Sequence, residues 1–262
     1  MQKPDSKLLY VSTRDAHTRS SDGSTYTINM PNAHSINKTV SLVPMSVTLD
    51  NMFTNVNGYN NEIVFYTSPV APIGTVHSVT VDQYSNTELA TAWNTLYGAL
   101  AGLTFTLTGT KFEFGSCGGQ YITAPLDHWR LLGFQDQVVK VIDDTYSLTL
   151  PGSGTLTAST HPNLGGEKLV NIVVDEMGHS NCVHSKDGMA HDVIAHISFA
   201  DTAYGNSATW RAGDTETHSI EFKNHKNMNN LVVEIRDHHL RPINLPSNYH
   251  LKMYFKVYHR DY

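Results

Sequence analysis

Short segments with β-strand character recur along most of this sequence, and only one segment has helical periodicity. Some of the segments alternate polar and apolar residues with a period of two, as residues 26–30 do. Others, such as residues 169–174, are continuous apolar runs typical of a buried central strand. Many short strands joined by connections of mixed length favour a two-sheet sandwich or jelly roll over a parallel sheet with alternating helices.

The strands are predicted from alternation, β-branched content and the turn residues that bound them. Alternation within 251–258 places the even-numbered side chains, such as Tyr254, on a solvated or subunit-facing side, with the odd-numbered ones in the core. Pro44 predicts an edge or a bulge in its strand, and Asn57-Gly58 predicts a type I′ hairpin. The predicted strands span residues 8–12, 26–30, 40–49, 62–66, 76–81, 104–107, 111–114, 138–142, 146–150, 169–174, 193–199, 217–222, 231–235 and 251–257.

One helix is expected at residues 87–100, where apolar side chains recur every three or four positions after a polar N-terminus. A Phe-rich hairpin and the stretch 126–134 follow it. The Leu-Leu-Gly-Phe at 131–134 is too apolar for water, and Gly133 indicates a bend or a close backbone approach. We therefore predict that residues 86–134 form a short helix-plus-hairpin insertion closed by an apolar plug.

The length of 262 residues suits one domain with elaborated loops. We expect residues 1–23 to form an N-terminal arm with a first short strand, and 24–262 to form a single all-β domain, a two-sheet sandwich or jelly roll, that carries the insertion. A net charge of −6 argues against nucleic acid as the main partner. No run is long and apolar enough to span a membrane, and the first residues lack the apolar region of a signal peptide. We expect no membrane span and no secretion.

A His- and Cys-rich loop is the one place where the sequence suggests a metal. His179, Cys182 and His184 offer ligand types that zinc prefers, and His191 and His196 follow. Their spacing matches no recognised zinc template, so we assign no metal ligand, although metal binding by His179, Cys182, His184 and His191 stays open. Cys117 and Cys182 do not form a disulfide framework, and their redox state stays open as well.

Other polar motifs are interpreted as turns. Asp143-Asp144, Asp201 and Asp237 match no calcium loop, acid-base carboxylates cannot be paired from sequence alone, and Asp is common at turns and strand ends. The Gly-rich residues 115–119 lack the Lys-Ser/Thr of a phosphate-binding loop, and no nucleophile motif is present. We predict no catalytic residue, no cofactor and no enzyme activity.

The order of several weak motifs resembles one family of capsid proteins. The departures from the family pattern are Pro44 and the loop at 178–191, which matches no family motif. The motifs are Ser12-Thr13-Arg14-Asp15, the strand 26–30 with Pro31-Asn32, the strand 40–50 with an Asn-rich turn and 62–65, the helix and hairpin with 131–134, and finally 231–237, 241–245 and 249–258. In this order they are similar to the penton-type and minor capsid single-jelly-roll proteins of large icosahedral double-stranded DNA viruses, virophages and polinton-like elements.

The resemblance implies a single jelly-roll β-sandwich and a non-enzymatic capsid protein in the virion, made and assembled in host cytoplasm. Five copies would close the five-fold vertex as a homopentamer beside the major capsid protein, or the chain would be a minor or cement protein. A ring needs head-to-tail interfaces, which we expect at strand-connecting loops and at the insertion. Two other classes are a glycan-binding β-sandwich of lectin or fibre type, using exposed Tyr and Trp, and a zinc-dependent enzyme using His179, Cys182 and His184.

Overall fold

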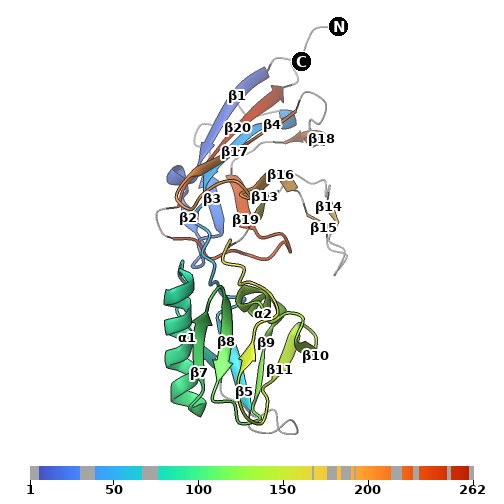
Figure 1. Ribbon diagram of the computed structural model, residues 1–262. Helices are drawn as coiled ribbons and strands as arrows, with labels where there is room; N and C mark the ends of the chain where they lie inside the picture. Colours follow the sequence, from blue (N-terminus) through green and yellow to red (C-terminus); the bar gives the residue numbers. More distant parts are fainter. Residues whose placement is uncertain are drawn as a thin grey trace. The chain divides into compact units, whose positions relative to one another are not determined.

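The computed structural model (Figure 1) describes residues 6–29, 39–66, 76–166, 168–175, 182–183, 190–191, 193–213, 220–226, 230–246 and 249–259. The chain forms two compact units: a discontinuous unit, Met1–Phe53 with Glu167–Tyr262, and an inserted unit, Thr54–Gly166. The predicted division differs from this one. The expected insertion at 86–134 covers only the middle of the inserted unit, because strands on both sides of it belong to the same sheets.

Among its described residues, the discontinuous unit contains two five-stranded antiparallel sheets and the separate two-stranded pair β14–β15. Its elements are β1 Ser6–Ser12, the 3-10 helix η1 Thr13–Asp15, β2 Thr18–Arg19, β3 Thr25–Asn29, β4 Thr39–Asp50, β13 Leu169–Asp175, β14 Cys182–Val183, β15 Ala190–His191, β16 Val193–Ser198, β17 Ser207–Arg211, β18 Ile220–Lys226, β19 Asn230–Arg236 and β20 Leu251–His259. One sheet has the order β1-β20-β4-β17, with β18 also paired to β4, and the other has the order β16-β13-β19-β3-β2. The expected N-terminal arm is therefore in part an edge strand, since β1 pairs with β20 along its whole length.

The order of these strands defines the fold class. If β1, β3, β4, β13, β16, β17, β19 and β20 are taken as first to eighth, one sheet reads 1-8-3-6 and the other 2-7-4-5. This order arises when the antiparallel pairs 1-8, 2-7, 3-6 and 4-5 of one long hairpin fold over into a sandwich, which gives a jelly roll. The predicted all-β jelly-roll sandwich is confirmed, and the inserted unit lies between its third and fourth strands.

Alternating side chains build the core of the sandwich. Leu251, Met253, Phe255 and Val257 of β20 are buried, as predicted, and they share one core cluster with Ile172 and other apolar residues of the second sheet. Pro44 lies in β4, next to a shift of register opposite Tyr254 and Phe255, so the predicted bulge is confirmed. Because β4 has partners on both sides, it is not an edge strand.

The described residues of the inserted unit form two sheets and two α-helices. Its elements are β5 Glu62–Tyr66, β6 Val76–Ser78, α1 Asn86–Ala101, β7 Thr104–Thr108, β8 Lys111–Gly115, β9 Tyr121–Pro125, α2 Leu126–Leu132, β10 Val138–Ile142, β11 Thr145–Thr149 and β12 Leu156–Thr157. The sheets have the orders β10-β11-β9-β5-β6 and β12-β8-β7. The predicted hairpin at Asn57-Gly58 is wrong, because β5 pairs with β6 and β9 and not with a strand before the turn.

Helix α1 begins and ends where local capping chemistry dictates. Ser85 is the N-cap residue: its hydroxyl accepts from the Glu88 backbone N–H, and the Glu88 carboxylate accepts from the Ser85 backbone N–H. The helix ends at Gly102, which adopts the left-handed conformation at φ 65°. The predicted helix at 87–100 is thus correct to within one residue at either end.

The predicted apolar plug is confirmed as part of an aromatic core. Leu131, Leu132 and Phe134 are buried, and the Phe134 ring lies 5.3 Å from that of Phe114. Gly133 has φ +85°, and a Cβ placed on it would lie 2.4 Å from the Thr160 carbonyl oxygen, so only glycine fits. No helix among the described residues is long and apolar enough to cross a membrane.

Candidate assembly surface

The His and Cys residues that suggested zinc are only partly described. His179 and His184 lie outside the described residues. Cys182 and His191 lie opposite each other in the β14–β15 pair, but their side chains are outside the description. His196 is placed elsewhere, with its Nδ1 2.6 Å from Asn171 Oδ1. Among the described side chains, no group of three or more His, Cys, Asp or Glu could hold a metal ion.

The Asp residues considered for chemistry lie in separate turns. Asp143 and Asp144 form the turn between β10 and β11, with Asp143 at φ 44°. Asp201 lies in an exposed turn after β16. The structure does not bring these carboxylates together with Asp237, which belongs to a network of its own.

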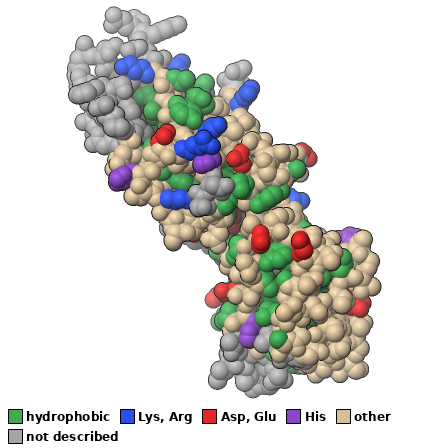
Figure 2. All heavy atoms as spheres, turned by 90° about the vertical axis from the view of Figure 1, so that its left-hand side faces the viewer, with side chains coloured by type: hydrophobic (Ala, Val, Ile, Leu, Met, Phe, Trp, Pro, Cys, Tyr) green, Lys and Arg blue, Asp and Glu red, His purple; other side chains and the backbone are tan. Residues whose placement is uncertain are grey.

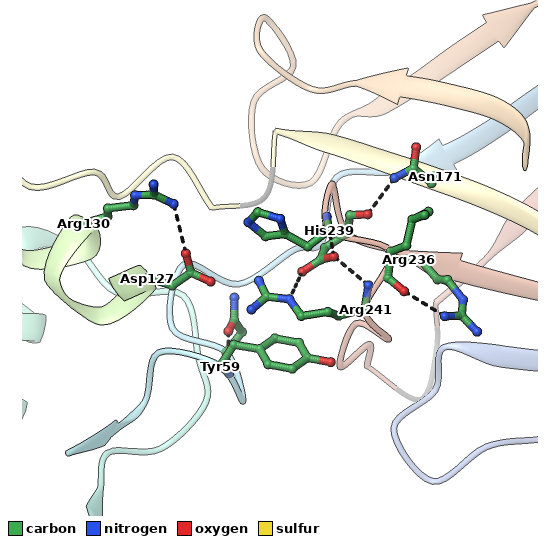
Figure 3. A network of polar contacts seen from close by, with 10 residues as sticks. Tyr59, Asp127, Arg130, Asn171, Arg236, His239 and Arg241 are labelled. Atoms are coloured by element: carbon green, nitrogen blue, oxygen red, sulfur yellow. Dashed lines mark hydrogen bonds and ion pairs between the residues drawn. The ribbon is translucent and has the colours of Figure 1, made fainter. Parts of the chain in front are cut away.

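Asp237 holds the turn after β19, in the discontinuous unit, through contacts with Asn171, His239 and Arg241, which Figure 3 labels. Its Oδ1 accepts from the backbone N–H of His239 and of Arg241, both at 2.8 Å, and its Oδ2 accepts from Arg241 Nε at 2.7 Å. Its backbone carbonyl accepts from Asn171 Nδ2 at 2.6 Å. Every one of these bonds fixes the turn, so the network is structural, as such buried polar groups usually are. In the inserted unit, Figure 3 also shows the ion pair of Arg130 with Asp127 on α2, at 3.5 Å.

The Gly-rich residues 115–119 form the predicted turn. The backbone N–H of Cys117 donates to the Gly154 carbonyl at 3.2 Å, and that of Gly119 donates to the Pro151 carbonyl at 2.9 Å. Cys117 is a buried free thiol, and burial raises its pKa. A thiol whose pKa is raised is a poor nucleophile, so this side chain has a packing role.

A buried histidine that the sequence did not single out lies in the core of the inserted unit. His128 is fully buried on α2, and its Nδ1 lies 2.9 Å from the Asn60 carbonyl oxygen, which makes Nδ1 the protonated nitrogen. Its ring meets the indoles of Trp93 and Trp129 edge-on, each at 4.8 Å, and its Nε2 has no hydrogen-bond partner in the protein. Burial lowers the pKa of His128 from 6.5 to about 4, so the ring is neutral at neutral pH.

Exposed apolar side chains gather in two places among the described residues. The first, which we call the tyrosine patch, consists of Leu8 and Tyr10 on β1 and Tyr254 on β20. The second, the β10 patch, consists of Val139, Val141 and Ile142 on β10. Figure 2 shows one face of the molecule, where hydrophobic side chains are mixed with charged ones. Because gathered apolar side chains can mark a contact surface, the two patches are the candidate assembly surfaces.

The aromatic residues considered for glycan binding divide between core and surface. Trp93 and Trp129 are fully buried, and Trp210 packs against the core of the sandwich. Tyr249 is also buried and donates from its hydroxyl to the Asp50 carbonyl at 2.9 Å. Of the predicted C-terminal tyrosines, Tyr254 and the half-buried Tyr258 therefore remain accessible, and Tyr262 lies outside the described residues.

Sequence reasoning predicted the strand β10 but not its exposure. The signal was present, because Val138-Val139-Lys140-Val141-Ile142 lacks the polar-apolar alternation of a strand that covers a core on one side. For β9 and β17, no strand was predicted. Each segment is only five residues long and contains Ala, which has a low strand propensity, so its strand character becomes clear only once its pairing partners are known.

Comparisons with known proteins give similarity in structure but not in sequence. No protein-family model matches the chain, and no curated protein matches it. The crystal structure of the mavirus penton protein is similar, with 13% sequence identity and a TM-score of 0.44 over 97% of this chain and 99% of that chain. A chain of the Sputnik virophage structure, determined by cryo-EM, has 11% identity and a TM-score of 0.47 over 98% of each chain.

Proposed function

We propose that this chain is a structural capsid protein, and that it forms the penton at the five-fold vertex of an icosahedral double-stranded DNA virus. The observation that carries the proposal is the jelly-roll strand order with a separate compact unit between the third and fourth strands. Jelly rolls of this type are recurrent in viral shells. The order of sequence motifs that resembles the penton family runs through both units.

The partners in this proposal are four further copies of the chain and the major capsid protein. The protein acts in the virion after assembly in host cytoplasm, with no enzyme activity, no cofactor and no nucleic acid as main partner. A minor or cement protein of the same shell is the second position that such a subunit occupies.

The proposal is tested by assembly in solution and by position in the particle. Native mass spectrometry of the purified protein is expected to show a pentamer, and a symmetry-averaged virion map is expected to place it at the five-fold vertex. Density between the major capsomers would assign it as a minor protein instead. Protein that stays monomeric at high concentration and is absent from virions would overturn the capsid role.

One observation favours a second function, glycan binding. The rings of Tyr10 and Tyr254 lie side by side on an exposed sheet face, with their centroids 5.0 Å apart. Tyrosine rings of this kind can stack on sugars, whereas the buried Trp93 and Trp129 cannot. Saturable binding on a glycan array that Tyr254→Ala abolishes would support this function.

A zinc site at His179, Cys182, His184 and His191 is tested separately by elemental analysis. A stoichiometric metal and a lower melting temperature in chelator would require a metal centre. We propose that neither is found, because the spacing of these residues fits no zinc template.

A further inference from the structure

A closed ring of identical subunits needs two different surfaces on each copy, because every contact joins one flank to the opposite flank of the next copy. The inference that follows rests on the proposed pentamer and names those two surfaces. The tyrosine patch and the β10 patch are the places where large apolar side chains gather on the described surface.

The β10 patch lies on a sheet edge of the inserted unit. Val139, Val141 and Ile142 are 70%, 60% and 65% exposed, which is unusual for three β-branched residues within four positions. β10 is the terminal strand of its sheet, so its outer backbone groups also face away from the other strands. A shift of register between Lys140 and Ile142 interrupts the strand, which hinders continuous pairing with another strand. We therefore expect the patch to make contact through its side chains.

The tyrosine patch lies on the outer face of the jelly-roll sheet that contains β1 and β20. Tyr10 and Tyr254 are directly opposite each other in the register, and Leu8 lies two residues before Tyr10 on the same face. Their exposed fractions are 47%, 39% and 68%. Tyr side chains contribute large contact areas at low entropic cost, which is why they are frequent at the centres of interfaces.

The rims of the two patches carry charges of opposite sign, while β10 itself also contains the exposed Lys140. The β10 patch is followed directly by Asp143 and Asp144, both exposed at the hairpin turn. Lys252 and Lys256 flank Tyr254 on the face of the tyrosine patch, and neither β1 nor β20 contains an acidic residue. Lys256 already lies over the Tyr258 ring, with its Nζ 5.0 Å from the centroid, so Lys252 is the better partner for a carboxylate. Opposite charges at the rim steer association and fix its register.

We propose that the β10 patch of one copy packs on the tyrosine patch of the next copy around the ring, with Asp143 facing Lys252. The apolar side chains form the centre of this contact and the Asp–Lys pair lies at its rim. The two patches differ in residue composition and in the charges at their rims, so the contact is head-to-tail and is suited to a ring rather than to a two-fold dimer.

The apolar part of the proposal is tested with the double variant Val139→Ser and Ile142→Ser. Loss of two buried aliphatic side chains is expected to raise the dissociation constant of the ring contact about a hundredfold, measured by sedimentation velocity across a concentration series. Val76→Ser is the matched control, because Val76 is 55% exposed on β6 at the other edge of the same sheet. This control should assemble as the wild type does, and all variants should keep the wild-type circular dichroism spectrum.

The pairing of the two surfaces is tested with Asp143→Asn and Lys252→Gln in a double-mutant cycle. If the two side chains face each other, each single variant weakens assembly about threefold, and the double variant is little weaker than either one. If the effects of Asp143→Asn and Lys252→Gln on the dissociation constant are additive, the assigned pairing is wrong. If the Val139→Ser, Ile142→Ser variant assembles as the wild type does, the β10 patch is not an interface. Wild-type protein that forms no ring would contradict the pentamer itself, so the two failures are distinct.

Discussion

Acidification is expected to destabilise the inserted unit through one residue, His128. The neutral ring is enclosed by the indoles of Trp93 and Trp129 and by the carbonyl oxygen of Asn60, none of which carries a charge. A proton added to Nε2 would place a positive charge in this core without a hydrogen-bond partner. In the unfolded chain the same imidazole is hydrated and takes up a proton readily.

The size of this loss of stability follows from the difference between the pKa of His128 in the folded protein and its pKa in the unfolded chain. The pKa of His128 is about 4 in the folded protein and 6.5 in the unfolded chain, so the unfolded state binds more protons between these values. The contribution that neutral His128 makes to the free energy of unfolding is fully present above pH 6.5 and is lost as the pH falls toward 4. The loss approaches about 3 kcal/mol at pH 4 and is about 2 kcal/mol at pH 5.

Tryptophan fluorescence during urea unfolding measures this effect. Trp93 and Trp129 report on the inserted unit, and the background variant Trp210→Phe removes the tryptophan of the jelly roll. The free energy of unfolding of this unit is expected to fall by about 2 kcal/mol between pH 7.5 and 5.

The variant His128→Asn keeps a donor for the Asn60 carbonyl but removes the titrating group. It should be less stable than the wild type at pH 7.5, because the smaller side chain leaves a cavity, and its stability should depend less on pH. His161→Asn is the matched control, because His161 Nδ1 also contacts a backbone carbonyl, that of Thr110 at 3.2 Å, but the side chain is exposed. An equal pH dependence in His128→Asn and the wild type would refute the reasoning.

Further substitutions test the packing and the hydrogen bonding of the fold. Phe134→Asp, like Leu132→Asp, is expected to prevent folding or assembly, because it buries an unpaired charge at a cost of several kcal/mol; a soluble, assembling variant would show that the plug is surface. Gly133→Ala should cost about 3 kcal/mol in urea unfolding, whereas Gly109→Ala, also at positive φ but with open space, should cost about 1 kcal/mol, and equal costs would contradict the close approach. Asp237→Asn should lower stability by about 2 kcal/mol through the lost charged acceptor, and an unchanged melting temperature would argue against the network.

The sequence by itself determined the features that depend on local chemistry. Alternation placed Leu251, Met253 and Phe255 in the core, because a strand that covers a core must present an apolar residue at every second position. Local signals also identified α1, the bulge at Pro44 and the need for glycine at 133. The strands alone predicted a two-sheet sandwich or a jelly roll, and the resemblance to the capsid family narrowed this to a single jelly roll.

The tertiary structure decided which strands pair and where each unit begins. β1 and β20 are neighbours although they stand at opposite ends of the chain, and no local pattern encodes such a partner. The inserted unit extends far beyond 86–134 for the same reason, because β5 and β11 are joined through β9, a five-residue strand that was not recognised from the sequence. The burial of His128 and the exposure of the β10 patch have one common cause. Whether a side chain meets water depends on what packs against it, and that is settled only when distant segments come together.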